Sequence, residues 1–255
     1  GPQKIQFQPG FPPMDNPKVR RAIFLAVDRW DVSERVYEET GEPGTILDSR
    51  IYGDWALPKE EVYKLPGLRK DKAADIAEAK KLLAEAGYPN GFEAIWQVRN
   101  TAEYVPTAMV VAAQLEKIGI KSKIESLDAS AGSKIIAQGK WHLGSSGGND
   151  GFHALVSLRK LRTPSTYANF NAPWTDSNKQ FVDMYDKALT SLDLIEAKKL
   201  VWDMQRYLLT KDTYFFHAVW IDSPIVVWNQ VKNYYPSTYG MFSGALDYTI
   251  VWLDQ

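Results

Sequence analysis

The stretch between Asp75 and Asp128 constrains the fold of this chain more than any other part of it. Its first segment places Ile76, Ala79, Leu82, Leu83 and Ala86 at helical spacing, and these residues form one apolar stripe. Gly87 suits the left-handed conformation that ends many helices, and Pro89 prevents the helix from resuming. An amphipathic helix that stops at Gly87 is therefore expected.

Two predicted strands and a second predicted helix follow this stop. Phe92–Val98 and Ile120–Ser126 read as strands, and the segment between them at about Ala102–Ile118 reads as a helix that ends at Gly119. Strand, helix and strand in this order make a parallel crossover unit, which is almost always right-handed. The pattern predicts an α/β fold in which helices pack on a sheet around this unit.

The rest of the chain alternates between helical and extended patterns. Asn16 and Pro17 are typical of a helix start, and so is Asp193. Further helices are expected at 17–29, 31–39, 155–161, 178–192 and 194–210, and further strands at 4–7, 141–143, 214–220, 225–228 and 247–253.

Composition excludes some classes of function. The formal net charge is −1 and the sequence has no long basic run, so a nucleic-acid or anionic-membrane surface is not indicated. The chain has no cysteine, which excludes disulfides and thiolate metal sites. It contains no apolar run of about 18 residues, so no membrane span is expected, and no secretory signal sequence is visible.

Several motifs together resemble one protein family. Residues 79–92, followed by 113–120, are similar to a stretch of the large substrate-binding proteins of ABC importers. Residues 13–29 resemble the start of the C-terminal lobe in that family, and 181–189 resemble its late helical pair. The group most similar is the dipeptide, oligopeptide and nickel-binding family, the family 5 solute-binding proteins.

The resemblance implies a fold and a setting for the chain. It implies a periplasmic-binding-protein-like lobe with a mixed sheet flanked by helices. Family members are longer, so residues 1–255 are expected to be a single C-terminal lobe without its N-terminal lobe. Gly1-Pro2 is either a remnant of protease cleavage or native sequence. The resemblance also suggests a structural ion pair between Asp28 and Arg29, with a solvated helix end as the alternative.

The resemblance further implies capture of a peptide or peptide-like solute, without catalysis and without a cofactor. The expected partners are the ligand, the N-terminal lobe and the transmembrane subunits of an ABC permease. The expected location is periplasmic or extracytoplasmic, and a lipid anchor on the full-length protein is compatible with it. A non-transport interaction or signalling module derived from such a lobe is the alternative function.

The glycine-rich loop at 144–151 is the first part of the candidate ligand site, because glycine lets a backbone approach a ligand closely. In peptide-binding members of the family, an aspartate after a tryptophan-containing strand pairs with the free amine of the ligand. Asp150 lies near that place, with Asn149 beside it and with Trp141 and Ser145 before it. A turn formed by Asn-Asp-Gly is the structural alternative.

A second candidate segment follows in the chain. Aromatic walls with a few amide groups suit neutral or zwitterionic ligands. Tyr167, Asn169, Phe170 and Asn171 have this composition and are expected to complete the pocket wall. Packing of these side chains beneath the loop is the alternative.

The sequence also offers two chemical alternatives, a hydrolase and a metal site. Residues 144–148 match G-x-S-x-G, with Ser146 as nucleophile and with Asp176 or Asp203 and then His217 in hydrolase order, but the following glycines are a poor helix start. His142, Asp150 and His153 are close in sequence, but they lack the fixed spacing of helical metal ligands.

Overall fold

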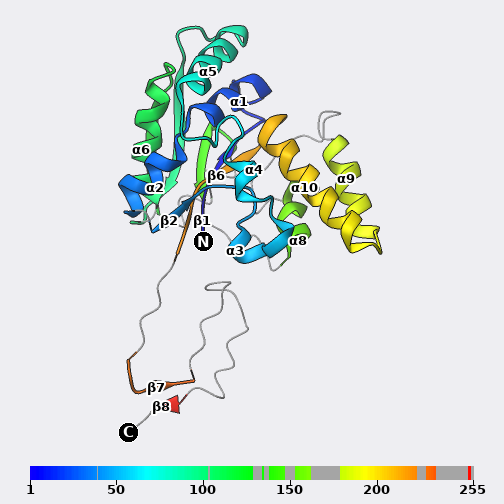
Figure 1. Ribbon diagram of the computed structural model, residues 1–255. Helices are drawn as coiled ribbons and strands as arrows, with labels where there is room; N and C mark the ends of the chain where they lie inside the picture. Colours follow the sequence, from blue (N-terminus) through cyan, green and yellow to red (C-terminus); the bar gives the residue numbers. More distant parts are fainter. Residues whose placement is uncertain are drawn as a thin grey trace.

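The computed structural model, shown in Figure 1, describes most of the chain. The residues that it describes are 1–38, 40–102, 104–128, 134, 138–146, 153–161, 179–222, 228–233 and 252–253.

A six-stranded sheet forms the centre of the fold, in the order β2-β6-β1-β5-β3-β4. β3 pairs in parallel with both β4 and β5, whereas β1 pairs antiparallel with β5 and β6, and β2 pairs antiparallel with β6. The sheet is therefore mixed, as predicted. The strands are β1 (Pro2–Phe7), β2 (Gly41–Pro43), β3 (Glu93–Arg99), β4 (Lys121–Leu127), β5 (Leu143–Ser146) and β6 (Phe215–Ile221).

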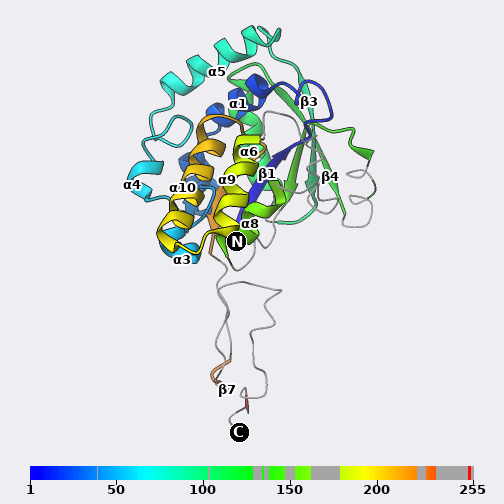
Figure 2. The same ribbon diagram turned by 90° about the vertical axis from the view of Figure 1, so that its right-hand side faces the viewer.

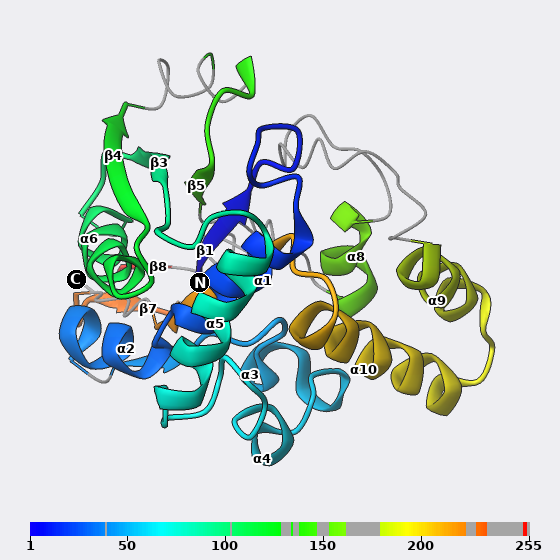
Figure 3. The same ribbon diagram turned by 90° about the horizontal axis from the view of Figure 1, so that it is seen from above.

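Helices cover the sheet on both sides. Figure 3 shows α2 and α6 on one side and α8, α9 and α10 on the other. The helices are α1 (Pro17–Ala26), α2 (Arg29–Tyr37), α3 (Ser49–Tyr52), α4 (Lys59–Val62), α5 (Ala73–Glu85), α6 (Tyr104–Glu116), α8 (Ala154–Leu158), α9 (Lys179–Thr190) and α10 (Leu194–Thr210), with 3-10 turns η1 (Gly53–Trp55) and η2 (Arg159–Leu161). We call this sheet with its helices the body. Within the described part of the chain, no helix is long and apolar enough to span a membrane.

The predicted crossover unit is confirmed as β3, α6 and β4. The two strands stay in parallel register from Glu93 opposite Lys121 to Arg99 opposite Leu127. The turns before them are built on glycine: Gly91 has φ +76°, and a Cβ placed there would lie 2.0 Å from the carbonyl oxygen of Gly119. Only glycine permits both the positive φ and this close approach.

The prediction for Asp28 and Arg29 is wrong in both of its forms. α1 ends at Ala26, and the Asp28 carboxylate caps α2 by accepting hydrogen bonds from the backbone amides of Trp30 and Asp31. Arg29 is 1% exposed, and its guanidinium donates to the carbonyls of Gly67 and His217 rather than to a carboxylate. It also lies over the rings of Phe24 and Phe216. Arg29 therefore joins α2 to β6 and to the loop before α5.

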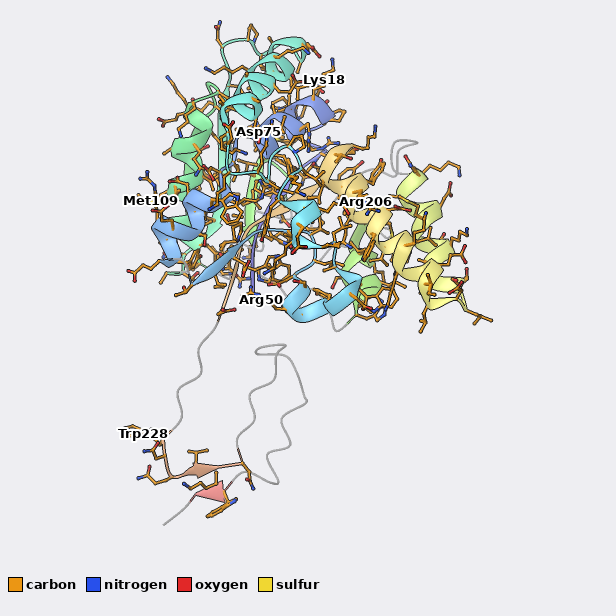
Figure 4. All side chains as sticks on the ribbon, viewed as in Figure 1. Lys18, Arg50, Asp75, Met109, Arg206 and Trp228 are labelled. Carbon is orange, nitrogen blue, oxygen red and sulfur yellow. The ribbon has the colours of Figure 1, made fainter. Side chains whose placement is uncertain are left out.

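A second buried charge lies at the start of α5. The Asp75 side chain is fully buried and accepts hydrogen bonds from the Gly67 amide (2.8 Å), Arg69 (2.7 Å) and Lys72 (3.0 Å). Figure 4 labels Asp75 within the body. Asp75 thus links the 67–72 loop to α5, in whose first turn it lies.

The helical pair near the C-terminus is confirmed as α9 and α10, with Asp193 capping α10. Large apolar side chains are exposed at the turn between these helices. They are Leu189 (59%), Leu192 (101%), Leu194 (66%) and Ile195 (81%), and we call them the apolar tip. In the described part of the chain, these four side chains are largely exposed to solvent.

Two further short strands lie apart from the body in Figures 1 and 2. β7 (Val231–Lys232) pairs antiparallel with β8 (Trp252–Leu253). β8 falls within the strand expected at 247–253, whereas most of the strand expected at 225–228 lies outside the described residues. Trp228, next to β7, and Trp252 are 81% and 51% exposed.

Candidate functional site

The directions of the strands identify the edge of the sheet at which a ligand is expected. β3, β4, β5 and β6 all run in one direction, because β3 is parallel to β4 and β5, and β1 is antiparallel to both β5 and β6. Their last residues are Arg99, Leu127, Ser146 and Ile221. We call this the carboxyl edge. In open α/β sheets, ligands bind outside the carboxyl ends of the strands.

β1 begins and β6 ends at this same edge, as Figure 1 shows. Gly1 and Ile221 exchange two hydrogen bonds, of 2.6 Å from the Gly1 amino group and 2.9 Å from the Ile221 amide. Residues before β1 or after β6 would therefore lie beside any ligand bound at the carboxyl edge.

Two of the predicted site residues are described. Trp141 is fully buried just ahead of β5, where its ring lies against Gly144. Ser145 is half-buried in β5, and its hydroxyl accepts a hydrogen bond from the indole of Trp96 (2.9 Å). Ser145 thus lies one residue before the carboxyl edge, while Trp141 lies in the interior; their role toward a ligand stays a prediction.

The remaining predicted site residues lie outside the described residues, and their roles stay predictions. They are Asn149, Asp150, Tyr167, Asn169, Phe170 and Asn171.

The hydrolase alternative gains no support from the described residues. Ser146 and His217 both stand opposite Lys4, on the two strands that flank β1, so their backbones are about 10 Å apart. His217 is buried, with Nδ1 2.7 Å from the Thr45 carbonyl oxygen, and Asp203 lies on α10 in ion pairs with Lys199 and Arg206. These groups do not form a nucleophile and its base. Asp176 lies outside the described residues.

The two histidines of the metal alternative have local roles. His142 Nδ1 accepts a hydrogen bond from the Ile95 amide (2.8 Å), and burial lowers the pKa of His142. His153 caps α8 by accepting from the Leu155 amide and lies against Trp55. Asp150 lies outside the described residues, and among those that are described no group of three potential ligands could hold a metal ion.

The structure adds two charged residues that the sequence analysis missed. Arg99 ends β3 and Asp128 follows β4, and both side chains are exposed at the carboxyl edge. Neither forms a salt bridge with another residue of the described part of the chain. No local pattern in the sequence distinguishes these two charges, because only the topology brings the ends of β3 and β4 to the same edge.

A cluster of charges borders the carboxyl edge beside β6. Asp48 is 3% exposed and caps α3, and its carboxylate binds the guanidinium of Arg50 through two nitrogens. The free end of that guanidinium is 2.9 Å from Asp222, which directly follows β6. The hydrogen bonds that Arg50 donates to Asp48 are the main cause that raises the pKa of Arg50.

Comparison with known proteins gives matches along most of the chain. The family model described as bacterial extracellular solute-binding proteins, family 5 Middle, matches residues 1–169. The glutathione-binding protein GsiB of Escherichia coli (strain K12) is 27% identical over an alignment of 229 residues, and the match covers 84% of this chain and 40% of GsiB. The chain therefore spans less than half the length of this curated relative.

Solved structures share the fold. OppA of Haemophilus influenzae in complex with RPPGFSPFR superposes with a TM-score of 0.76 at 18% identity, covering 92% of this chain and 45% of OppA. DppA from Helicobacter pylori in complex with the peptide STSA has a TM-score of 0.68 at 22% identity, covering 86% of this chain and 41% of DppA. With the family match over more than half of its length, the chain belongs to the family 5 bacterial extracellular solute-binding proteins.

Proposed function

We propose that this chain is the C-terminal lobe of an extracytoplasmic solute-binding protein that captures a peptide or peptide-like molecule for an ABC importer. The observation that carries the proposal is the carboxyl edge, where four strands end and β1 begins. The protein acts by binding and a change of conformation, not by catalysis. Its location is periplasmic or extracytoplasmic, and its partners are the transmembrane subunits of the importer.

The intact protein would close two lobes around the ligand. Gly1 and Ile221 are neighbours, and connections to a second lobe at these two places would suit a hinge because few residues would have to change conformation there. β7 and β8 follow Ile221 in the chain, and a two-stranded ribbon is at best marginally stable alone. The other lobe would supply the packing that this ribbon lacks. Ligand contacts on both lobes exist only when they are closed, so the ligand shifts the population toward closure.

The charges at the carboxyl edge favour a ligand with a carboxylate and an amine. Arg99 presents an exposed guanidinium, which pairs well with a carboxylate. Asn149 and Asp150 follow β5 in the sequence, and a carboxylate suits a free ammonium. A peptide has both groups, and the matched relatives are named for glutathione or were solved with peptides. Trp141, Ser145 and the aromatic and amide residues at 167–171 would complete the pocket.

The first test is native mass spectrometry of the intact protein purified without added ligand. A co-purified peptide would support the proposal and supply the ligand for later work. A co-purified sugar would overturn the peptide assignment, and an empty protein that binds no member of a peptide library would overturn peptide capture altogether. The isolated chain should bind only at about millimolar strength, because one lobe offers part of the contacts.

Two substitutions then test the polarity of the site. Arg99→Gln should weaken binding of a peptide with a free C-terminus by at least about tenfold, and should leave its C-terminally amidated analogue unaffected. Asp150→Ala should weaken binding of a peptide with a free N-terminal amine to a similar extent, and should leave its N-acetylated analogue unaffected. Lys179→Gln, at an exposed position on α9, is the control and should change neither. Equal losses for blocked and free peptides would contradict these assignments.

The apolar tip favours one alternative, a lobe used for contact with a partner rather than for transport. Monomeric proteins seldom expose four neighbouring aliphatic side chains to this extent. The full-length gene separates the two functions. A secretory signal, an upstream lobe and neighbouring permease genes would favour transport, and their absence would favour the interaction module.

A further inference from the structure

The point where the chain leaves β6 is fastened to the body by a side chain. Asp222 is the first residue beyond β6, and its carboxylate lies 2.9 Å from Nη1 of Arg50. Arg50 also donates a longer hydrogen bond, of 3.4 Å, to the carbonyl of Trp220 within β6. Figure 4 labels Arg50 at the edge of the body from which the chain departs. One guanidinium thus contacts the chain on both sides of the last residue of the strand.

Arg50 is held in place by Asp48, independently of its contact with Asp222. The buried Asp48 accepts from Nε at 2.9 Å and from Nη2 at 2.5 Å, and it also accepts from the backbone amide of Arg50. A guanidinium fixed in this way loses little conformational freedom when it binds a second carboxylate. The Arg50–Asp222 contact is therefore better ordered than an ordinary ion pair between two mobile side chains, although Asp222 is 67% exposed.

The contact lies at the position where a movement of lobes would act. Hinges are a few residues at the ends of elements that absorb changes of backbone angle. Ile221 is tied to Gly1 by two backbone hydrogen bonds, so the first backbone free to change direction on this strand is at Asp222. A change of direction there would move the Asp222 carboxylate relative to Arg50, which stays with Asp48.

We infer that Arg50 is a positioning residue of the hinge, whose contact with Asp222 is made in one lobe arrangement and lost in the other. This inference rests on the proposed two-lobe function. Breaking the contact should change the ratio of the two arrangements by about two- to fivefold, which is the range expected for an exposed but ordered ion pair. The ligand affinity should change by a corresponding factor, because only one arrangement binds tightly.

The test measures lobe closure in the intact protein without relying on a known ligand. One fluorophore is placed at Lys117→Cys on this lobe and one on the other lobe, and the distance distribution is recorded by single-molecule energy transfer. Asp222→Asn and Arg50→Gln should each shift the ratio of the two populations, and the double variant should shift it no further than either single variant. Glu85→Gln, which breaks the similarly exposed Lys18–Glu85 pair remote from the hinge, should leave the ratio unchanged.

Three results would overturn the inference. The first is an unchanged ratio in Asp222→Asn with an unchanged melting temperature. The second is a double variant whose shift equals the product of the single shifts, since independent effects mean no coupling. The third is a single, fixed interlobe distance in the unsubstituted protein that no peptide changes; this result would remove the proposed two-lobe function as well, whereas the first two would leave it standing.

Discussion

The crossover unit and the loop before α5 are stabilised in opposite ways. β3, α6 and β4 are joined by glycine turns and by apolar side chains such as Trp96, Val111 and Leu115, all fully buried or nearly so. The 67–75 segment is stabilised instead by the buried charges of Arg29 and Asp75 and by hydrogen bonds to loop carbonyls and amides. The first region tolerates no added volume, and the second tolerates no loss of the Asp75 carboxylate.

The largest effect is expected from Asp75→Ala. The substitution leaves Lys72 and Arg69 without their buried partner, and breaking a buried ion pair in this way costs about 3–5 kcal/mol of the free energy of unfolding. Urea denaturation of the two proteins measures the loss. Asp183→Ala, in the exposed Lys179–Asp183 pair, is the control and should cost less than about 1 kcal/mol. Equal losses would mean that the charged cluster does not stabilise the loop.

Gly91→Ala tests the crossover region, with an expected cost of about 2–4 kcal/mol. The positive φ and the contact of the new Cβ with the Gly119 carbonyl both oppose the change. Gly53→Ala is the matched control, since Gly53 also has a positive φ but has nothing within 4 Å of a Cβ. Thermal denaturation should give a clearly lower melting temperature for Gly91→Ala than for Gly53→Ala. The same melting temperature for both would refute the close-approach explanation.

The charged region should also give the chain an unusual pH dependence. Burial and the neighbouring Arg29 lower the pKa of Lys72 from 10.5 to about 8. Between about pH 8 and 10.5, the folded chain has released this proton while the unfolded chain still holds it, so the Lys72 contribution to stability rises with pH by at most about 1.4 kcal/mol per unit. Below about pH 8 both states are protonated and the contribution is constant.

Lys72→Met isolates this contribution, because other groups titrate in the same range. The difference in unfolding free energy between the unsubstituted protein and Lys72→Met should grow in favour of the unsubstituted protein between pH 8 and 10.5. Parallel pH profiles for the two proteins would show that Lys72 has an ordinary pKa.

The smallest effect is expected from Glu85→Gln, which removes the exposed Lys18–Glu85 pair between α1 and α5. The loss of unfolding free energy should be much smaller than that of Asp75→Ala and should vanish at 1 M salt, because solvent screens exposed charges. A larger, salt-independent loss would show that surface pairs contribute to this fold as the buried cluster does.

The same contrast explains how much could be predicted from the sequence. The crossover was predictable because helical and strand periodicity and glycine stops are local signals, and Gly87 indeed has φ +91°. The role of Arg29 was not predictable, because its partners Gly67 and His217 are remote in sequence and are backbone carbonyls. Arg99 was missed because an exposed cation has no local pattern until the topology places it at the carboxyl edge. The ligand role of Asp150 stays a prediction.

Hydrogen exchange of the intact protein tests the central claim most directly. The protein is measured with its co-purified ligand and again after the ligand has been removed by unfolding and refolding. Ligand-dependent protection is expected in peptides that contain or directly follow the strand ends at the carboxyl edge, namely 97–103, 128–134 and 143–153. Protection confined to the apolar tip at 189–195, with none at the carboxyl edge, would contradict it.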